Sequence, residues 1–214
     1  MKASIAAATR SADAAQAGTR PWITAEFEVV LLSRSEAGVN IVMHVTLKNI
    51  GHSPAQYVFL SPRVVFYDYE NGIKTQREVC EDSIKAWDNI RRSDNIIFPS
   101  DAQLTNSTGI IRMKDVIDWQ DRRIARGLQR KNPMDEREAE SERKFTVFGV
   151  VGCISYGFAG SPNIHQTGFI LTLTNAPKQP GGAAAPTLID ITKDGEFPVG
   201  NLLLVQDLYG SFAN

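Results

Sequence analysis

The stretch Val45-Thr46-Leu47-Lys48-Asn49-Ile50-Gly51-His52-Ser53-Pro54-Ala55 ends one alternating run of residues and begins a second apolar segment. Upstream of it, every second residue from Ile41 to Leu47 is apolar, which is the period of a half-buried strand. Asn49 and Gly51 tolerate positive φ, and Pro54 fixes a turn before the next apolar run. Units of this kind build immunoglobulin-like sandwiches. We therefore take Asn49, Gly51, Ser53 and Pro54 as a signature loop of the fold.

The predicted fold class is mainly β with minor α. We expect an immunoglobulin-like antiparallel β-sandwich with an N-terminal helix and one or two inserted helices. The early strands are predicted to form a meander with turns at 33–38 and 70–72. The predicted strands cover residues 23–32, 39–48, 56–60, 63–69, 95–98, 102–113, 145–158, 166–174, 188–191 and 202–205.

The chain divides into a tail and one larger domain. Residues 1–20 form an Ala-rich helical tail or stalk, because eight of the first 17 residues are Ala. Residues 21–214 form the sandwich domain, with a helical and charged insertion at about 114–144. Within it, 114–130 reads as an amphipathic helix and 131–144 as a mobile loop or an exposed helical extension. Residues 75–92 suggest a short helix or an irregular excursion, and 177–186 a flexible loop.

The overall charge excludes one class of function. The chain has 214 residues, 23 Lys and Arg against 24 Asp and Glu, and a formal net charge of -1. This balance supplies no field to attract nucleic acid, so no nucleic-acid partner is expected. There is also no apolar run long enough to cross a bilayer and no apolar core of a secretory signal.

Two cysteines, Cys80 and Cys153, leave three possibilities open. They can form a disulfide, which would close a loop of about 74 residues, stabilise the fold by roughly 4 kcal/mol and imply an oxidising compartment. Cys153 can instead be a buried structural thiol in its apolar strand. A nucleophile paired with His165 is the third reading, and its match to known Cys–His sites is weak.

The sequence predicts no catalytic, cofactor-binding or metal-ligating residue. His44, His52 and His165 do not occur at a metal-ligand spacing. Asp115, Asp118 and Asp121 recur every three residues on the predicted helix, and neighbouring Arg residues favour a solvated face over a cation site. Phosphate-cradling loops and nucleophile elbows are missing from the sequence. We expect no cofactor.

Four segments together resemble an uncharacterised family of proteobacterial proteins. They are Ala12 to Trp22, Leu47 to Ala55, Val150 to Tyr156, and His165 to Phe169. The resemblance implies a single N-terminal transmembrane helix, an Ala-rich juxtamembrane helix and an extracytoplasmic β-sandwich. It implies no activity, because the family has none established.

The resemblance also bears on location and on the cysteines. This chain begins inside the juxtamembrane helix, so attachment to a membrane is expected only through a tether missing from this chain. We expect the periplasm or the extracytoplasmic face of the inner membrane, with the cytoplasm as the alternative. That setting, and Cys at both positions in relatives, favour the Cys80–Cys153 bridge.

Three functional hypotheses follow. The first is a non-enzymatic binding or scaffold module with a protein partner, which presents loops or an edge strand and can oligomerise through the N-terminal helix. The second is a structural or accessory subunit of a larger multisubunit or virion-like assembly. The third is a hydrolase that uses Cys153 or a carboxylate pair.

Overall fold

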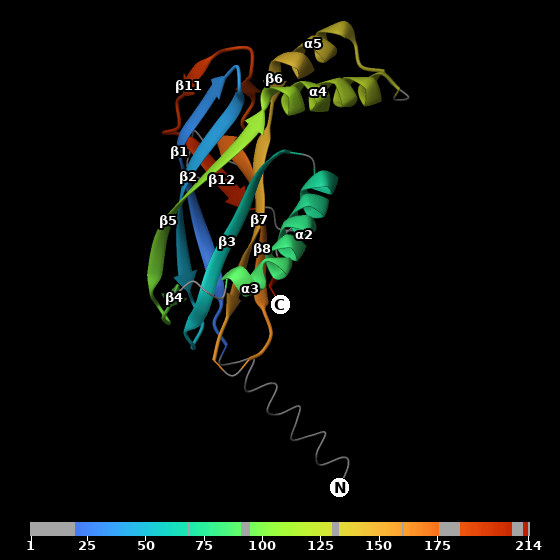
Figure 1. The fold of residues 1–214 in the computed structure, drawn as a ribbon. Coiled ribbons are helices and arrows are strands. Elements are labelled where there is room, and N and C mark those ends of the chain that lie inside the picture. The colour runs from blue at the N-terminus through green and yellow to red at the C-terminus, as the bar shows by residue number, and fades with distance from the viewer. Residues whose placement is uncertain are drawn as a thin grey trace.

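The protein is mainly β and its strands pair antiparallel, as the sequence predicts (Figure 1). The computed structural model describes residues 20–67, 69–90, 95–129, 133–159, 161–175, 185–206 and 212–213. The predicted helix at 1–19 and most of the predicted loop at 177–186 lie outside these residues.

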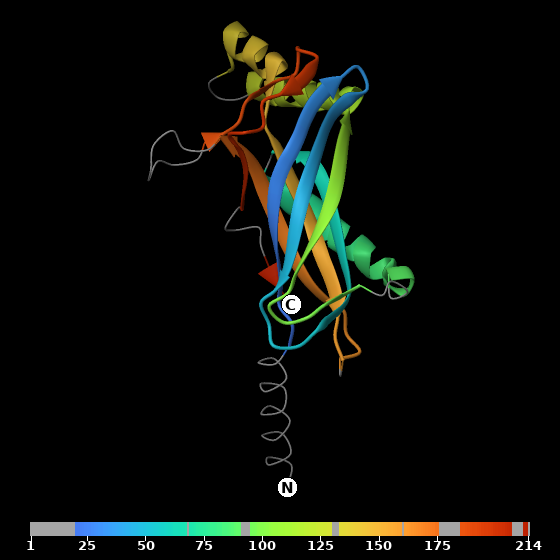
Figure 2. The same cartoon turned by 90° about the vertical axis from the view of Figure 1, so that its left-hand side faces the viewer.

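The first sheet has four strands in the order β11-β1-β2-β5. They are β1 (Ile23–Ser35), β2 (Gly38–Asn49), β5 (Ala102–Arg112) and β11 (Gly195–Phe197). β2 forms a hairpin with β1 and pairs with β5 along its whole length (Figure 2). Gly38 follows the hairpin turn at a φ of 146°, and a Cβ there would lie 2.0 Å from the carbonyl oxygen of Ile111. Only glycine fits this position.

The second sheet runs β12-β8-β7-β3-β4, and β9 and β13 also pair with β8. Its strands are β3 (Ala55–Phe66), β4 (Ile96–Ile97), β7 (Phe148–Gly157), β8 (His165–Asn175), β9 (Ala185–Pro186), β12 (Leu202–Gln206) and β13 (Phe212–Ala213). Every residue of β7 is buried, which confirms the predicted central strand covered on both faces. A separate small pair joins β6 (Phe145–Thr146) and β10 (Ile189–Asp190).

The hydrophobic core lies between the two larger sheets. The inward residues of β1 and β2, such as Leu32 and Met43, meet those of β7 and β8, such as Phe148 and Leu173. The two sheets curl around this core into an incomplete barrel (Figure 2). The alternation seen in the sequence thus places one face of each early strand in the core.

Four helices are described, and they lie outside the barrel. They are α2 (Tyr69–Lys85), α3 (Trp87–Ile90), α4 (Met113–Leu128) and α5 (Glu136–Lys144). α2 lies along the outer face of the second sheet, and α4 packs with α5 at one end of the barrel (Figure 1). α5 is the predicted exposed helical extension. It begins at a capping box in which Asp135 accepts from the N–H of Glu138 and Glu138 accepts from that of Asp135.

Two local predictions are wrong. The two strands expected at 56–60 and 63–69 form one strand, β3. Pro62 is tolerated within it because β3 pairs with β4 only at Ala55 and Gln56, which leaves an unpaired edge beside the proline. The turn expected at 70–72 lies inside α2, where Gly72 packs on the second sheet and tertiary contact overrides the local turn signal.

The prediction that the early strands form a meander is also wrong at the signature loop. The chain leaves the first sheet after β2 and enters the second sheet at β3, so the loop is a crossover between sheets. The physical reason is that the open edge of β2 is taken by β5, from later in the chain.

Candidate functional site

The signature loop is a structural connection. Asn49 is fully buried, and its side-chain amide binds backbone groups from several segments. Its Nδ2 donates to the carbonyl oxygens of Ser53 at 2.8 Å and Ile97 at 2.9 Å. Its Oδ1 accepts from the N–H of Gly51 at 3.0 Å and of Trp22 at 3.4 Å. Asn49 therefore joins the start of β1, the crossover and β4.

Glycine is needed at position 51 for a reason that the sequence did not reveal. Neither Asn49 nor Gly51 is among the residues with positive φ. A Cβ at Gly51 would lie 2.5 Å from both the carbonyl oxygen of Arg20 and the nitrogen of Trp22. The loop passes directly against the chain that leads into β1, and no larger residue fits there. Ser53 and Pro54 are partly exposed at the end of this loop.

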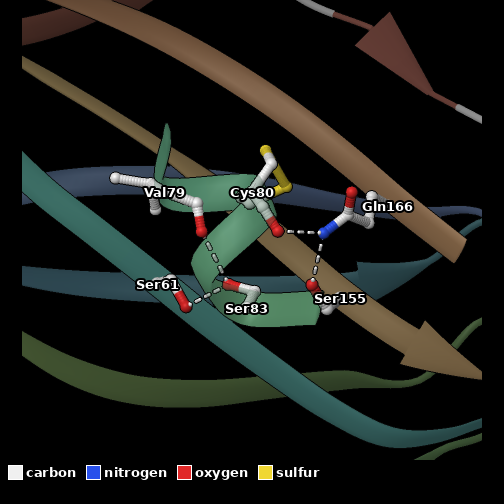
Figure 3. The surroundings of a disulfide bond; sticks show 7 residues. Ser61, Val79, Cys80, Ser83, Ser155 and Gln166 are labelled. Atoms are coloured by element: carbon white, nitrogen blue, oxygen red, sulfur yellow. Dashed lines mark hydrogen bonds between the residues drawn. A yellow bond between two sulfur atoms is a disulfide. The ribbon is translucent and has the colours of Figure 1, made fainter. Parts of the chain in front are cut away.

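The disulfide between Cys80 and Cys153 confirms the predicted bridge. It joins α2 to the fully buried strand β7, with the two Cα atoms 5.2 Å apart (Figure 3). Around it, Gln166 Nε2 donates to the carbonyl oxygen of Cys80 at 2.9 Å and to Ser155 Oγ at 3.1 Å. The hydroxyls of Ser61 and Ser83 lie 2.8 Å apart. α2 is thus tied to three strands of the second sheet.

The bridge removes the thiol from the proposed Cys–His site. Cys153 is fully buried and oxidised, so it has no thiolate to act as a nucleophile. His165 packs on the rings of Tyr156 and Phe158, and its Nε2 lies 3.2 Å from Ser161 Oγ. A structural disulfide of this kind is typical of proteins in oxidising, extracytoplasmic compartments.

An open groove of about 710 Å³ lies between α2 and α4, and we call it the α2–α4 groove. Its volume is in the range of ligand-binding sites. Side chains at i, i+3, i+4 and i+7 of α2 form one wall, and side chains at i, i+4, i+7 and i+11 of α4 form the other. The lining residues are Asn71, Lys74, Thr75 and Glu78 of α2, Asp115, Trp119, Arg122 and Arg126 of α4, Arg63 to Phe66 of β3, and Ile110 and Ile111 of β5.

Cations dominate the charge of the groove. Arg63, Lys74, Arg122 and Arg126 line it, against only Glu78 and Asp115. Asp115 is already engaged, because Arg112 donates to both of its carboxylate oxygens at 2.8 and 3.1 Å. That hydrogen bond lowers the pKa of Asp115 below its ordinary value, so the carboxylate stays ionised and paired. The other acid, Glu78, lies 4.0 Å from Lys74. The groove is therefore left with an excess of positive charge.

Trp119 gives the groove an aromatic wall, while its indole nitrogen is buried. Its ring stacks on that of Phe66, with the two ring centroids 4.8 Å apart. The guanidinium of Arg123, also on α4, lies 5.1 Å from the centroid of the Trp119 ring. The side chain is only 5% exposed, and its Nε1 finds no acceptor among the described residues. An unpaired buried donor costs about 1–3 kcal/mol.

The three aspartates that recur on α4, Asp115, Asp118 and Asp121, do not converge on one point. Asp115 pairs with Arg112, whereas Asp118 and Asp121 are exposed on α4. Among the residues that the structure describes, no group of three or more His, Cys, Asp or Glu side chains could hold a metal ion. None of the described helices is both long enough and apolar enough to cross a membrane.

Comparison with known proteins adds no relative: no protein-family model, no curated protein and no solved structure matches this chain. The candidate site therefore rests on the geometry of the chain itself.

Sequence reasoning missed the groove. The spacing of Arg122 and Arg126 on one face of the predicted helix was a usable signal, and it was interpreted as a solvated face. The opposite wall was hidden, because Asn71 and Lys74 precede the predicted start of their helix at residue 75. The two walls meet only in the folded structure, where α2 packs on the second sheet and α4 contacts β2 and β5.

Proposed function

We propose that the protein is a non-enzymatic, extracytoplasmic binding module that binds an acidic segment of a protein partner in the α2–α4 groove. The observation that carries the proposal is the excess of positive side chains around an open groove with an aromatic wall. Clusters of Arg are a recurring means of recognising acidic peptide motifs.

The lining suits an extended chain segment with both acidic and apolar side chains. Arg63 and Arg122 can bind carboxylates, since guanidinium groups form paired hydrogen bonds with them. The exposed side chain of Ile110 and the face of Phe66 offer contacts for apolar neighbours.

The place of action is part of the same proposal. We infer the periplasm or the outer face of the inner membrane, and the buried disulfide supports an oxidising compartment. We also propose that the fold is an immunoglobulin-like sandwich, and the two antiparallel sheets that face each other across one core support this.

The test is binding of a short fluorescein-labelled peptide rich in Glu and Leu, followed by fluorescence anisotropy at low salt. We expect saturable binding by the wild-type protein. The variant Arg122→Glu/Arg126→Glu should bind at least about tenfold more weakly, because two attractive contacts become repulsive.

The matched control is Arg77→Glu/Arg137→Glu, which makes the same change in net charge at exposed positions outside the groove. It should bind the peptide within about twofold of the wild-type protein. Equal loss in both variants, or no saturable binding by the wild-type protein, would overturn the proposal. Far-ultraviolet circular dichroism checks that each variant is folded.

A further inference from the structure

β5 is a long edge strand with none of the usual protection against pairing. The first sheet ends at β5, whose 11 residues pair with β2 on one side only. Residues 102–111 contain no charged residue and no Pro, and the register with β2 has no bulge. Charges, prolines and bulges are the devices by which proteins block such edges. The opposite edge of this sheet, β11, has only three residues and one of them is Glu196.

Two large apolar side chains project from the outer face of β5. Leu104 is 64% exposed and Ile110 is 67% exposed, with the polar residues Asn106 and Thr108 between them on the same face. The inner face is occupied differently, since β3 packs against it at Gly109, where a Cβ would lie 2.0 Å from Val64 Cγ2. The outer face and the edge without a hydrogen-bonded neighbour are therefore the parts of β5 that another strand can use. A cavity of about 190 Å³ lies between β5 and β3 at Gln103 to Ser107.

The sequence of β5 is self-complementary about Ser107. Leu104 and Ile110 each lie three residues from Ser107 on opposite sides. If a second β5 pairs antiparallel with Ser107 opposite Ser107, Leu104 of each copy faces Ile110 of the other on the outer face. Asn106 then faces Thr108, and Thr105 faces Gly109. Cross-strand apolar pairs are a main source of stability in antiparallel sheets.

We propose that a second copy of this chain binds at β5, and that two first sheets join into one continuous sheet across a two-fold axis at Ser107. A two-fold axis is the commonest symmetry of homodimers, and it requires one surface to complement itself. Backbone hydrogen bonds along the strand supply affinity, while Leu104 and Ile110 fix the register. The proposal shares Ile110 with the α2–α4 groove, whereas Leu104, which the first test changes, does not line it.

The first test is the mass in solution by sedimentation equilibrium. We expect a concentration-dependent dimer. Leu104→Lys should raise its dissociation constant at least about tenfold, because the change removes apolar burial and places two charges at the β5–β5 interface. Leu188→Lys is the matched control, since Leu188 is 63% exposed and lies before β10, away from β5. A wild-type protein that stays monomeric at all concentrations, or equal weakening by both variants, would contradict the proposal.

The second test shows where the two-fold axis of the dimer crosses β5. Both native cysteines are bridged, so Ser107→Cys adds one thiol on β5. Facing Cα atoms in antiparallel strands are about 4.5–5.5 Å apart, which a disulfide can join. The control Gln103→Cys lies on the same face, and its two copies would be about 27 Å apart in this register. We expect a covalent dimer from Ser107→Cys only; a dimer from Gln103→Cys alone would overturn the axis.

Discussion

At the scale of single residues, the sequence predicted the place of Asn49 in the fold but not the role of its side chain. Its position after an alternating run correctly predicted the end of a strand. Its role could not be predicted, because its amide binds Trp22 and Ile97, which lie 27 and 48 residues away in the chain. A turn signal is local, whereas these hydrogen bonds exist only once both sheets have formed.

We expect Asn49→Ala to lower the free energy of unfolding by about 3 kcal/mol, because the buried groups of Gly51, Ser53 and Ile97 lose their partner. Urea unfolding followed by fluorescence measures the change. Asn201→Ala, at an exposed position, should stay within about 0.5 kcal/mol of the wild-type protein. A loss below about 1 kcal/mol for Asn49→Ala would mean that water replaces the amide and that the crossover does not depend on it.

At the scale of elements, long periodic segments were predictable and their partners were not. The apolar run at 145–158 became β7, and the amphipathic pattern at 114–130 became α4. β3 was split in two because Pro62 looks like a strand breaker, and the sequence does not show that its edge is free there. The first turn of α2 was missed because the Asn71-Gly72 pair is a strong turn signal, which packing on the sheet overrides.

The attachment of α2 depends on the disulfide. We expect Cys80→Ala/Cys153→Ala to lower the free energy of unfolding by about 4 kcal/mol, since the bridge closes a loop with a sequence separation of 73. Amide hydrogens of α2 should exchange faster than those of β7, because the helix keeps only its packing and the hydrogen bonds from Gln166 and Ser61.

The control is the wild-type protein with its bridge reduced under native conditions, which should show the same change in exchange. If α2 stays as protected as β7 after both treatments, packing alone holds the helix. The α2–α4 groove would then keep its shape in a reducing compartment.

At the scale of the whole molecule, the alternating apolar pattern predicted the mainly β class, whereas the net charge gave a misleading picture of the local charge. Alternating strands required one buried face each, so a layered β fold followed. Which strand joins which sheet depends on crossovers such as the signature loop, whose contacts are far apart in sequence. The formal net charge of -1 is near zero, yet the described structure places four cations around one groove.

This difference between overall and local charge leads to the last prediction. The two double variants are Arg122→Glu/Arg126→Glu and Arg77→Glu/Arg137→Glu. Each of them changes the formal net charge of the protein from -1 to -5. A field of the whole molecule would change equally in both. We expect peptide binding by the wild-type protein and by the Arg77 and Arg137 variant to weaken steeply as salt rises, because the Debye length falls from about 30 Å at 0.01 M to about 3 Å at 1 M. Binding by the groove variant should not weaken as salt rises in the same anisotropy titration, because its groove then repels the acidic peptide and salt screens that repulsion. A steep dependence in the groove variant would assign the attraction to another surface and remove the electrostatic basis of the groove.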